Sequence, residues 1–361
     1  MVMRYLINGD FLCRSRTGME RFAYEICARL DKLVPTGEIG IFIPENAPVI
    51  PEYSNISVIR SRMKCTIFPL WVQGPFQCFV LLHKLIPLSF SNTCPVFKPG
   101  IAFLHDIYAK DCPEDFKSRR DKLIRLFDCF MYGVIARRAR HVITVSQFSR
   151  SRIIENYNVD PARISVIYNG WDHFKTVNSD DSVFEKFSCL SGRKYYFTLG
   201  SLSRRKNLAW IASYAENHTD DLFVISGKEI SGLIPPELEK LSKLPNILFT
   251  GYISDGQVKV LMQNCAAFIF PSYYEGFGIP PLEALSVGAN VVAARAASLP
   301  EIYGDTVHYI DPFNPDIDLD QMLKQTVEDP SLILKKYTYD QGAVQLNSLL
   351  FRNWVTNPLL D

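Results

Sequence analysis

The sequence lacks the features that would place the chain in a membrane or in an oxidising compartment. No apolar run approaches the roughly 20 residues needed to cross a bilayer. The start, Met1-Val-Met-Arg-Tyr-Leu-Ile-Asn8, has no signal-peptide layout. The nine cysteines are an odd number and include no Cys-x-x-Cys pair, so neither a disulfide framework nor a zinc site is predicted. These absences favour a reducing cytoplasm.

Other absences exclude classes of function. The net charge of +1 gives no global attraction to nucleic acid. No GxGxxG fingerprint is present, so a dinucleotide is not indicated and an oxidoreductase is only a distant alternative. There are no internal repeats and no low-complexity tracts. What remains is a globular composition, with 47% hydrophobic residues, in a length of 361 that suits two domains.

Short apolar strands alternate with helical patterns, which predicts parallel α/β sheets. The predicted strands are Arg4–Ile7, Ile39–Ile43, Ile56–Ile59, Ile101–Leu104, Val142–Val145, Ser165–Tyr168, Tyr195–Leu199, Leu222–Ser226, Ile247–Thr250, Ala266–Phe270, Val291–Ala294 and Val307–Ile310. The predicted helices are Met19–Leu33, Ser118–Arg140, Ser149–Tyr157, Leu208–Asn217, Pro236–Leu241, Asp255–Asn264, Pro281–Val287, Asp316–Val327 and one within Tyr337–Trp354. Ligands of such sheets bind beyond the carboxyl ends of the strands.

The strand Ala266–Phe270 is followed by Pro-Ser-Tyr-Tyr-Glu275-Gly-Phe-Gly-Ile-Pro-Pro-Leu-Glu283. The prolines suit the first turn of a helix, whose start attracts anions, so the backbone at 277–279 is expected to face a ligand. A carboxylate accepts hydrogen bonds from paired sugar hydroxyls. The segment therefore predicts a site for a sugar nucleotide, and the plain alternative is a strand-turn-helix with surface acids.

The strand Tyr195–Leu199 ends in Gly200-Ser-Leu-Ser-Arg-Arg205-Lys206-Asn. Three adjacent cations repel one another, and a diphosphate would neutralise them. The alternative is a solvated basic turn. No DxD-type metal motif accompanies this turn.

Together these two segments resemble the donor site of the family 4 retaining glycosyltransferases, which have the GT-B fold. The resemblance implies two Rossmann-like domains that face each other across a cleft, with a last helix that crosses back to the N-terminal domain. It implies an acceptor-binding domain of residues 1–172, plus the helix at about 338–361, and a nucleotide-sugar-binding domain of residues 173–337. The polar stretch Asp172–Arg193 is interpreted as the interdomain linker.

The resemblance also assigns roles to residues. In the family the first Glu contacts the donor sugar, the second contacts the ribose, and the Arg-Lys pair holds the diphosphate. It implies these site residues: catalytic Glu275, His105, Arg205 and Lys206, and donor-binding Gly18, Gly200, Gly227, Lys228, Tyr252, Ile253, Gly276, Phe277, Gly278, Ile279 and Glu283.

Two of these residues belong to the first half of the chain. His105 ends the strand Ile101–Leu104 and resembles the family's donor-sugar histidine, whereas the plain alternative is a packed His whose ring is satisfied by a carbonyl. Gly18 opens the first helix and fits as a close-approach glycine.

The resemblance implies transfer of a hexose or deoxyhexose, with mannose or rhamnose as candidates, from a nucleoside diphosphate sugar to a glycan or lipid-linked glycan. The expected context is cell-surface polysaccharide or lipopolysaccharide synthesis, with no cofactor and no metal. The alternatives are a GT-B epimerase, a phosphorylase or a non-catalytic sugar-nucleotide-binding subunit.

Two stretches suggest a peripheral contact with the inner face of the cytoplasmic membrane. Residues Cys65–Phe90 are rich in apolar side chains, and Lys117–Arg140 mixes eight Lys and Arg with Leu, Ile, Phe and Met. Basic amphipathic helices can lie on anionic lipid. The alternative is a half-buried helix with a solvated charged face.

Overall fold

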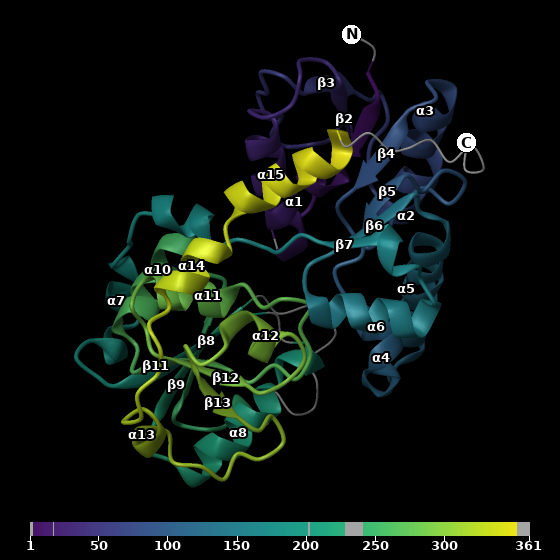
Figure 1. Ribbon diagram of the computed structural model, residues 1–361. Coiled ribbons are helices and arrows are strands. Elements are labelled where there is room, and N and C mark those ends of the chain that lie inside the picture. Colours follow the sequence, from purple (N-terminus) through teal and green to yellow (C-terminus); the bar gives the residue numbers. More distant parts are fainter. Residues whose placement is uncertain (1–2, 17, 201–202, 228–240, 352–361) are drawn as a thin grey trace. The chain divides into compact units, whose positions relative to one another are not determined.

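The computed structural model describes residues 3–16, 18–200, 203–227 and 241–351 (Figure 1). The chain forms two compact units, and it passes from the first to the second after Gly170 and back to the first after Lys336. Within the described residues, no helix combines the length and the apolar character that a membrane span requires.

The first unit is built on a seven-stranded sheet in the order β3-β2-β1-β4-β5-β6-β7, and every neighbouring pair is parallel. The strands are β1 (Tyr5–Asn8), β2 (Ile39–Ile43), β3 (Ser57–Arg60), β4 (Ile86–Ser89), β5 (Ile101–Phe103), β6 (His141–Thr144) and β7 (Ile164–Val166). Most of these strands are short and fully buried, as expected when helices cover both faces of a parallel sheet.

The helices of the first unit cover both faces of this sheet. They are η1 (Gly9–Cys13), α1 (Gly18–Leu30), α2 (Phe68–Trp71), η2 (Val72–Phe76), α3 (Gln77–Leu82), α4 (Tyr108–Asp111), η3 (Pro113–Asp115), α5 (Arg119–Arg138), α6 (Gln147–Tyr157), η4 (Pro161–Arg163) and α15 (Tyr339–Phe351). Ile7 packs in the core with α1 and α15, whereas its neighbour Leu6 points to the other face, where Trp71 and Phe76 lie.

The last helix of the described chain returns to the first unit, as the resemblance implied. Tyr339, Ala343 and Leu346 of α15 are buried against α1 in one core (Figure 1). Gly342 faces Ile26 so closely that a Cβ there would lie 3.2 Å from the Ile26 side chain. A long-range packing contact therefore fixes a helix whose presence alone could be predicted from periodicity.

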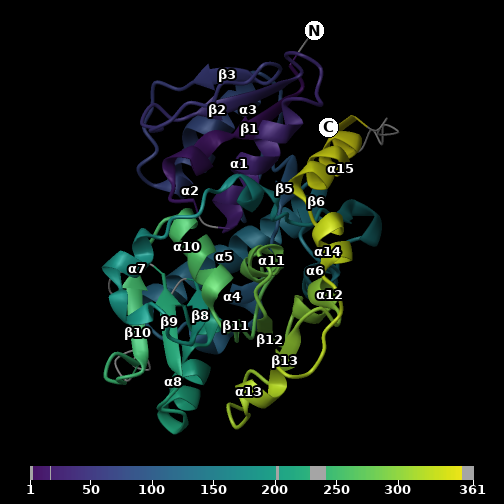
Figure 2. The same ribbon diagram turned by 90° about the vertical axis from the view of Figure 1, so that its left-hand side faces the viewer.

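The second unit has a six-stranded parallel sheet in the order β10-β9-β8-β11-β12-β13 (Figure 2). Its strands are β8 (Tyr195–Leu199), β9 (Leu222–Ser226), β10 (Ile247–Gly251), β11 (Ala267–Phe270), β12 (Val291–Ala294) and β13 (His308–Ile310). Its helices are η5 (Asp172–Thr176), α7 (Ser182–Lys186), η6 (Ser188–Leu190), η7 (Arg204–Lys206), α8 (Leu208–Asn217), α10 (Asp255–Asn264), α11 (Pro280–Ser286), α12 (Leu299–Tyr303), α13 (Leu319–Met322) and α14 (Ser331–Lys336).

The described structure differs from the predicted elements in several places, of which the following bear on the site or the domains. The strand β4 was missed because Pro87 lies inside it, and proline is unusual in a central strand. The helix predicted over Asp316–Val327 is only the short α13. The stretch interpreted as a linker folds onto the second unit through η5, α7 and η6, with buried Phe174, Val183 and Leu190. The helix predicted over Pro236–Leu241 lies, except for Leu241, outside the described residues.

Candidate functional site in the second unit

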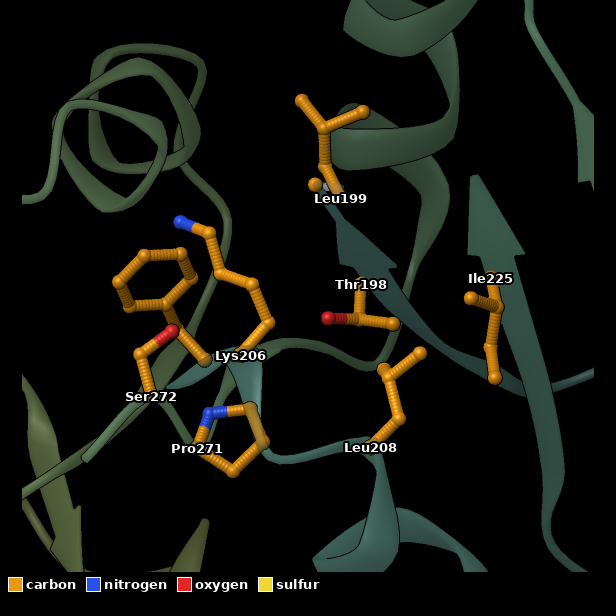
Figure 3. Close-up of a pocket in the computed structure, with 9 residues that line it drawn as sticks. Thr198, Leu199, Lys206, Leu208, Ile225, Pro271 and Ser272 are labelled. Atoms are coloured by element: carbon orange, nitrogen blue, oxygen red, sulfur yellow. The ribbon is translucent and has the colours of Figure 1, made fainter. Parts of the chain in front are cut away.

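A small pocket opens at the carboxyl ends of β8, β9 and β11, where the edge of a parallel sheet is expected to bind ligands (Figure 3). It is lined by Thr198, Leu199, Gly200, Lys206, Leu208, Ile225, Phe270, Pro271 and Ser272. The Lys206 side chain reaches past Pro271 and Ser272 along this pocket (Figure 3). Two segments that are distant in sequence, the basic turn after β8 and the loop after β11, therefore share one site.

Two glycines let the backbone close up beneath this site. A Cβ on Gly227 would lie 1.9 Å from the carbonyl oxygen of Gly200, which no side chain can tolerate. Gly200 itself has φ +153°, and a Cβ there would lie 3.3 Å from the Lys206 side chain. Close packing therefore explains why both of these predicted positions are occupied by glycine. Lys228, predicted beside them, lies outside the described residues.

Lys206, which is half-buried, and Glu275, which is buried, form an ion pair across the two loops. The Lys206 ammonium donates a hydrogen bond of 2.7 Å to Oε1 of Glu275, and Arg205 Nη1 lies 3.9 Å from Oε2. Burial alone would raise the pKa of Glu275, but the charges of Lys206 and Arg205 outweigh it and lower the pKa below its usual range. Glu275 is therefore an ionised carboxylate, able to accept hydrogen bonds and unable to donate a proton near neutral pH.

Backbone contacts hold the two loops together. The Tyr273 amide donates to the Arg205 carbonyl at 3.1 Å. Asn207, in the left-handed conformation with φ +55°, donates through its side-chain amide to the carbonyl oxygens of Pro271 and Pro312. Asparagine tolerates this conformation better than most residues. These contacts place the basic turn against the loop that carries Glu275.

The Gly-Phe-Gly segment turns the chain sharply between β11 and α11. Gly278 has φ +86°, and a Cβ there would lie 2.7 Å from the Leu299 side chain, so glycine is required twice over. The buried Tyr303 hydroxyl donates to the Gly278 carbonyl, and Phe277 and Ile279 are buried. Gly276 is also buried in this turn. The predicted loop is therefore a rigid support for Glu275.

Glu283 has a partner that the sequence did not suggest. It is buried on α11, and its Oε1 lies 3.0 Å from Nε2 of His173 on η5. His173 was assigned to no role because its surroundings read as a polar linker without a period. A usable signal was present in the apolar residues beside it, Trp171 and Phe174, which indicate a packed segment.

Tyr252 and Ile253, two further predicted residues of this unit, differ in how exposed their side chains are. Ile253 is buried, but the side chain of Tyr252 is 79% exposed. Tyr252 follows Gly251, whose φ is +68°, at the end of the edge strand β10. An exposed ring at a sheet edge can stack on a base, whereas Ile253 can only pack beneath it.

In the first unit, His105 is buried after β5, and its ring is held by the backbone. Nε2 lies 2.7 Å from the carbonyl oxygen of Phe90 and must be the donor, because a carbonyl only accepts. Burial lowers the pKa of His105, partly offset by that contact and by the charges of Asp106 and Glu20. The neutral ring therefore presents Nδ1 as an acceptor. Gly18 is the exposed first residue of α1.

Metal ligation is not suggested by the described part of the chain. Within it, no three His, Cys, Asp or Glu side chains gather in a way that could hold a metal ion. All nine cysteines are free thiols. Lys206 and Arg205 supply positive charge at this site.

Family models match both units. The family described as "Glycosyl transferases group 1" matches residues 180–340, and "Glycosyltransferase Family 4" matches residues 16–173. The first match contains Lys206, Glu275 and Glu283, and the second contains His105.

Characterised relatives are similar over part of their length. The O-antigen chain mannosyltransferase RfbU of Salmonella typhimurium is 25% identical over 239 residues, which are 64% of this chain and 62% of the relative. The O-antigen chain mannosyltransferase B of Escherichia coli is 27% identical over 270 residues, which are 72% of this chain and 69% of that protein. The chain thus matches less than two thirds of the Salmonella protein.

Solved structures match nearly the whole chain and show the fold. Sucrose-phosphate synthase from Thermosynechococcus elongatus has a TM-score of 0.73 at 14% identity, covering 96% of this chain and 98% of its own. Anabaena Alr3699/HepE, solved in complex with UDP-glucose, has a TM-score of 0.63 at 18% identity, covering 96% and 95%. These likenesses confirm the predicted GT-B fold.

Proposed function

Because this chain belongs to the family 4 glycosyltransferases, we propose that it transfers a hexose or deoxyhexose from a nucleoside diphosphate sugar to a hydroxyl of a glycan or lipid-linked glycan. The observation that carries the proposal is the partly buried ion pair of Lys206 and Glu275, with Arg205 beside it, at the carboxyl edge of the second sheet. The relatives' names favour mannose as the sugar and O-antigen or a similar surface polysaccharide as the product.

Lys206 and Arg205 would stabilise the leaving group. When the bond between the sugar and the diphosphate breaks, negative charge grows on the diphosphate, and fixed cations in a partly buried site lower the energy of that transition state. An ammonium group has three protons, so Lys206 can keep its bond to Glu275 and still donate to a phosphate oxygen. This arrangement supplies positive charge without a metal.

Glu275 would hold the donor sugar through its hydroxyls. Its carboxylate is ionised, oriented by Lys206 and carried by a rigid loop, so it can accept hydrogen bonds in a fixed direction. We expect transfer with retention: the acceptor oxygen bonds to the anomeric carbon on the face that the diphosphate leaves, and a diphosphate oxygen takes the acceptor proton. Glu275 needs no proton of its own in this step.

We assign acceptor binding to the first unit and ribose binding to Glu283. His105 would accept a hydrogen bond from a sugar hydroxyl at Nδ1, because Nε2 is held by the Phe90 carbonyl. The Tyr252 ring, which is exposed, and the Ile253 backbone would lie beside the base. Gly200 and Gly227 shape the floor beneath the diphosphate.

The first test is a thermal-shift screen with UDP, GDP, dTDP and ADP, followed by a transfer assay with the matching sugar nucleotides. A ligand bound only by the native state raises its melting temperature. We expect one nucleotide to do so, and its sugar conjugate to be consumed only when an acceptor is added. Consumption without an acceptor would instead indicate an epimerase or a hydrolase, and binding without turnover would indicate a non-catalytic subunit.

A face of α5 supports the proposed location at the inner surface of the cytoplasmic membrane. Leu123, Leu126 and Phe130 follow one another at helical spacing and are 68%, 67% and 55% exposed. Arg119 precedes them on the same face, and Lys122 is exposed beside them. Exposed apolar side chains next to cations suit the headgroup region of anionic lipid.

The membrane proposal is tested by co-sedimentation with anionic vesicles at low and moderate salt. The double variant Leu123→Ser, Leu126→Ser should lose pelleting, while Leu332→Ser, which changes a leucine of α14 that is 80% exposed, should not. Equal pelleting of all three chains, or none with the wild type, would remove the idea.

A further inference from the structure

We propose that His173 is a positioning residue that orients the Glu283 carboxylate toward the nucleotide ribose. The inference rests on the proposed function, in which Glu283 takes the ribose hydroxyls. Its basis is one contact that joins two separate segments: Nε2 of His173 lies 3.0 Å from Oε1 of Glu283, and the side chains are only 4% and 10% exposed.

The two residues stand on firmly held backbone. The Thr176 hydroxyl donates to the His173 carbonyl at 3.0 Å, and the Lys259 ammonium of α10 donates to the carbonyl oxygens of Phe174 and Val177. On the other side, the Ser286 hydroxyl donates to the Glu283 carbonyl at 2.7 Å. Because the backbone on both sides is fixed, the side-chain contact can set the carboxylate's orientation.

The chemistry of the pair favours such a role. Nε2 of His173 lies beside only one of the two carboxylate oxygens, 3.0 Å from Oε1. The remaining lone pairs, including those of Oε2, can accept from ribose hydroxyls. A buried carboxylate without a polar partner is costly and would turn toward any other donor. With His173 in place, the ligand finds the carboxylate already oriented.

A purely structural role is the alternative, in which His173 only pins η5 to α11. The two roles predict different losses. An orienting role affects ligands that contain a ribose and spares ligands that contain only phosphate. A pinning role lowers stability and weakens both kinds of ligand alike.

The experiment compares the binding of UDP, GDP and inorganic pyrophosphate by the full chain and by His173→Leu, His173→Gln and Glu283→Ala. We expect His173→Leu to weaken the preferred nucleotide by about tenfold, because the buried Glu283 carboxylate loses its polar neighbour, and to leave pyrophosphate unchanged. His173→Gln, which keeps a polar group beside the carboxylate, should recover part of the loss. His308→Leu is the matched control, because His308 is an equally buried histidine of the same unit.

The double variant decides whether the two residues act together. If His173 works through Glu283, the loss in His173→Leu, Glu283→Ala should equal that of Glu283→Ala alone. Additive losses, or equal losses for nucleotide and pyrophosphate, would overturn the inference while the proposed function stands. A wild-type chain that binds no nucleotide would overturn both the inference and the proposed function.

Discussion

The carboxyl edges of the two sheets carry different kinds of polar contact. In the second unit, polar side chains from separate segments meet each other, as Lys206 meets Glu275 and His173 meets Glu283. In the first unit, the ring of His105 meets a backbone carbonyl. A pair of charges from separate loops can hold a charged ligand between them, whereas a neutral ring held by the backbone suits hydroxyl groups.

The charged residues of the first unit point the same way. Asp10 of η1 and Arg14 just after it are joined at 2.7 Å, and Arg14 lies 3.7 Å from Glu20 at the start of α1. Burial raises the pKa of Asp10 in spite of Arg14. These groups pair with one another over a short stretch of chain, which supports our proposal that the anionic diphosphate binds in the second unit.

The largest expected effect comes from removing the Lys206 ammonium group of the second unit. Lys206→Ala should lower the transfer rate by a factor of about 10² to 10³, the usual cost of losing one donor that stabilises transition-state charge. The measurement is kcat with saturating donor. The control is Lys194→Ala, which removes another lysine that pairs with a carboxylate, Asp320, just before β8 rather than after it.

A rate for Lys206→Ala that matches that of Lys194→Ala would contradict the site assignment. Circular dichroism should show both variants folded, because each site is at least partly open to solvent.

Neutralising Glu275 should separate binding from catalysis. Glu275→Gln keeps the shape but removes a negative charge 2.7 Å from Lys206, so a nucleoside diphosphate should bind several-fold more tightly. Transfer should nevertheless fall by orders of magnitude, because the carboxylate that holds the sugar is lost. Calorimetric titration and the rate assay test the two parts, and weaker diphosphate binding would argue against a shared cation.

The close approach of Gly227 to Gly200 in the second unit leaves no room for a methyl group at position 227. Gly227→Ala would place a Cβ 1.9 Å from the Gly200 carbonyl, and overpacking of this kind costs about 1–3 kcal/mol. We expect a lower melting temperature together with weaker nucleotide binding. Gly74→Ala is the control, because nothing lies within 4 Å of a Cβ there. Equal melting temperatures for the two variants would show that Gly227 and Gly200 are not packed this closely.

His105→Phe in the first unit should have a moderate effect of a different kind. Loss of one hydrogen bond to a sugar hydroxyl should lower kcat/KM by about tenfold. The affinity for the free nucleoside diphosphate should not change, since His105 is assigned to the sugar. A weakened diphosphate affinity would break the division of roles between the units.

The smallest effect is a dependence of stability on pH. The pKa of Glu275 is held below its ordinary value of 4.5, so the ion pair stabilises the fold above that pH and is lost as the pH falls through the lower folded value. The wild type should melt above Glu275→Gln at pH 7, and the two should converge in acid. A constant difference between their melting temperatures would mean that Lys206 and Arg205 do not hold the charge.

The sequence predicted the parts of the molecule that depend on local pattern. Buried parallel strands such as Val291–Ala294 are short apolar runs that the sequence shows directly. Because Glu275 and Lys206 each follow such a run, both could be predicted at the carboxyl edge of one sheet. It could not show that Lys206 and Glu275 contact each other, since 69 positions separate them. It missed β4 because Pro87 breaks the strand pattern locally while tertiary packing holds it.

The sequence also failed where a polar segment is held by distant partners. His173 is buried because Lys259, Leu334 and Glu283 hold its segment to the second unit, and none of them is near it in sequence. For His105, the alternative of a packed ring bonded to a backbone carbonyl is correct at Nε2. The predicted contact with a sugar hydroxyl can therefore involve only Nδ1.

The most direct test of the central claim is a crystal structure of the full chain with its nucleoside diphosphate sugar. We expect diphosphate oxygens within hydrogen-bond distance of Lys206 and Arg205, with the sugar hydroxyls on Glu275. Density for the diphosphate beside Asp10 and Arg14, or anywhere away from Lys206, would contradict the proposed site.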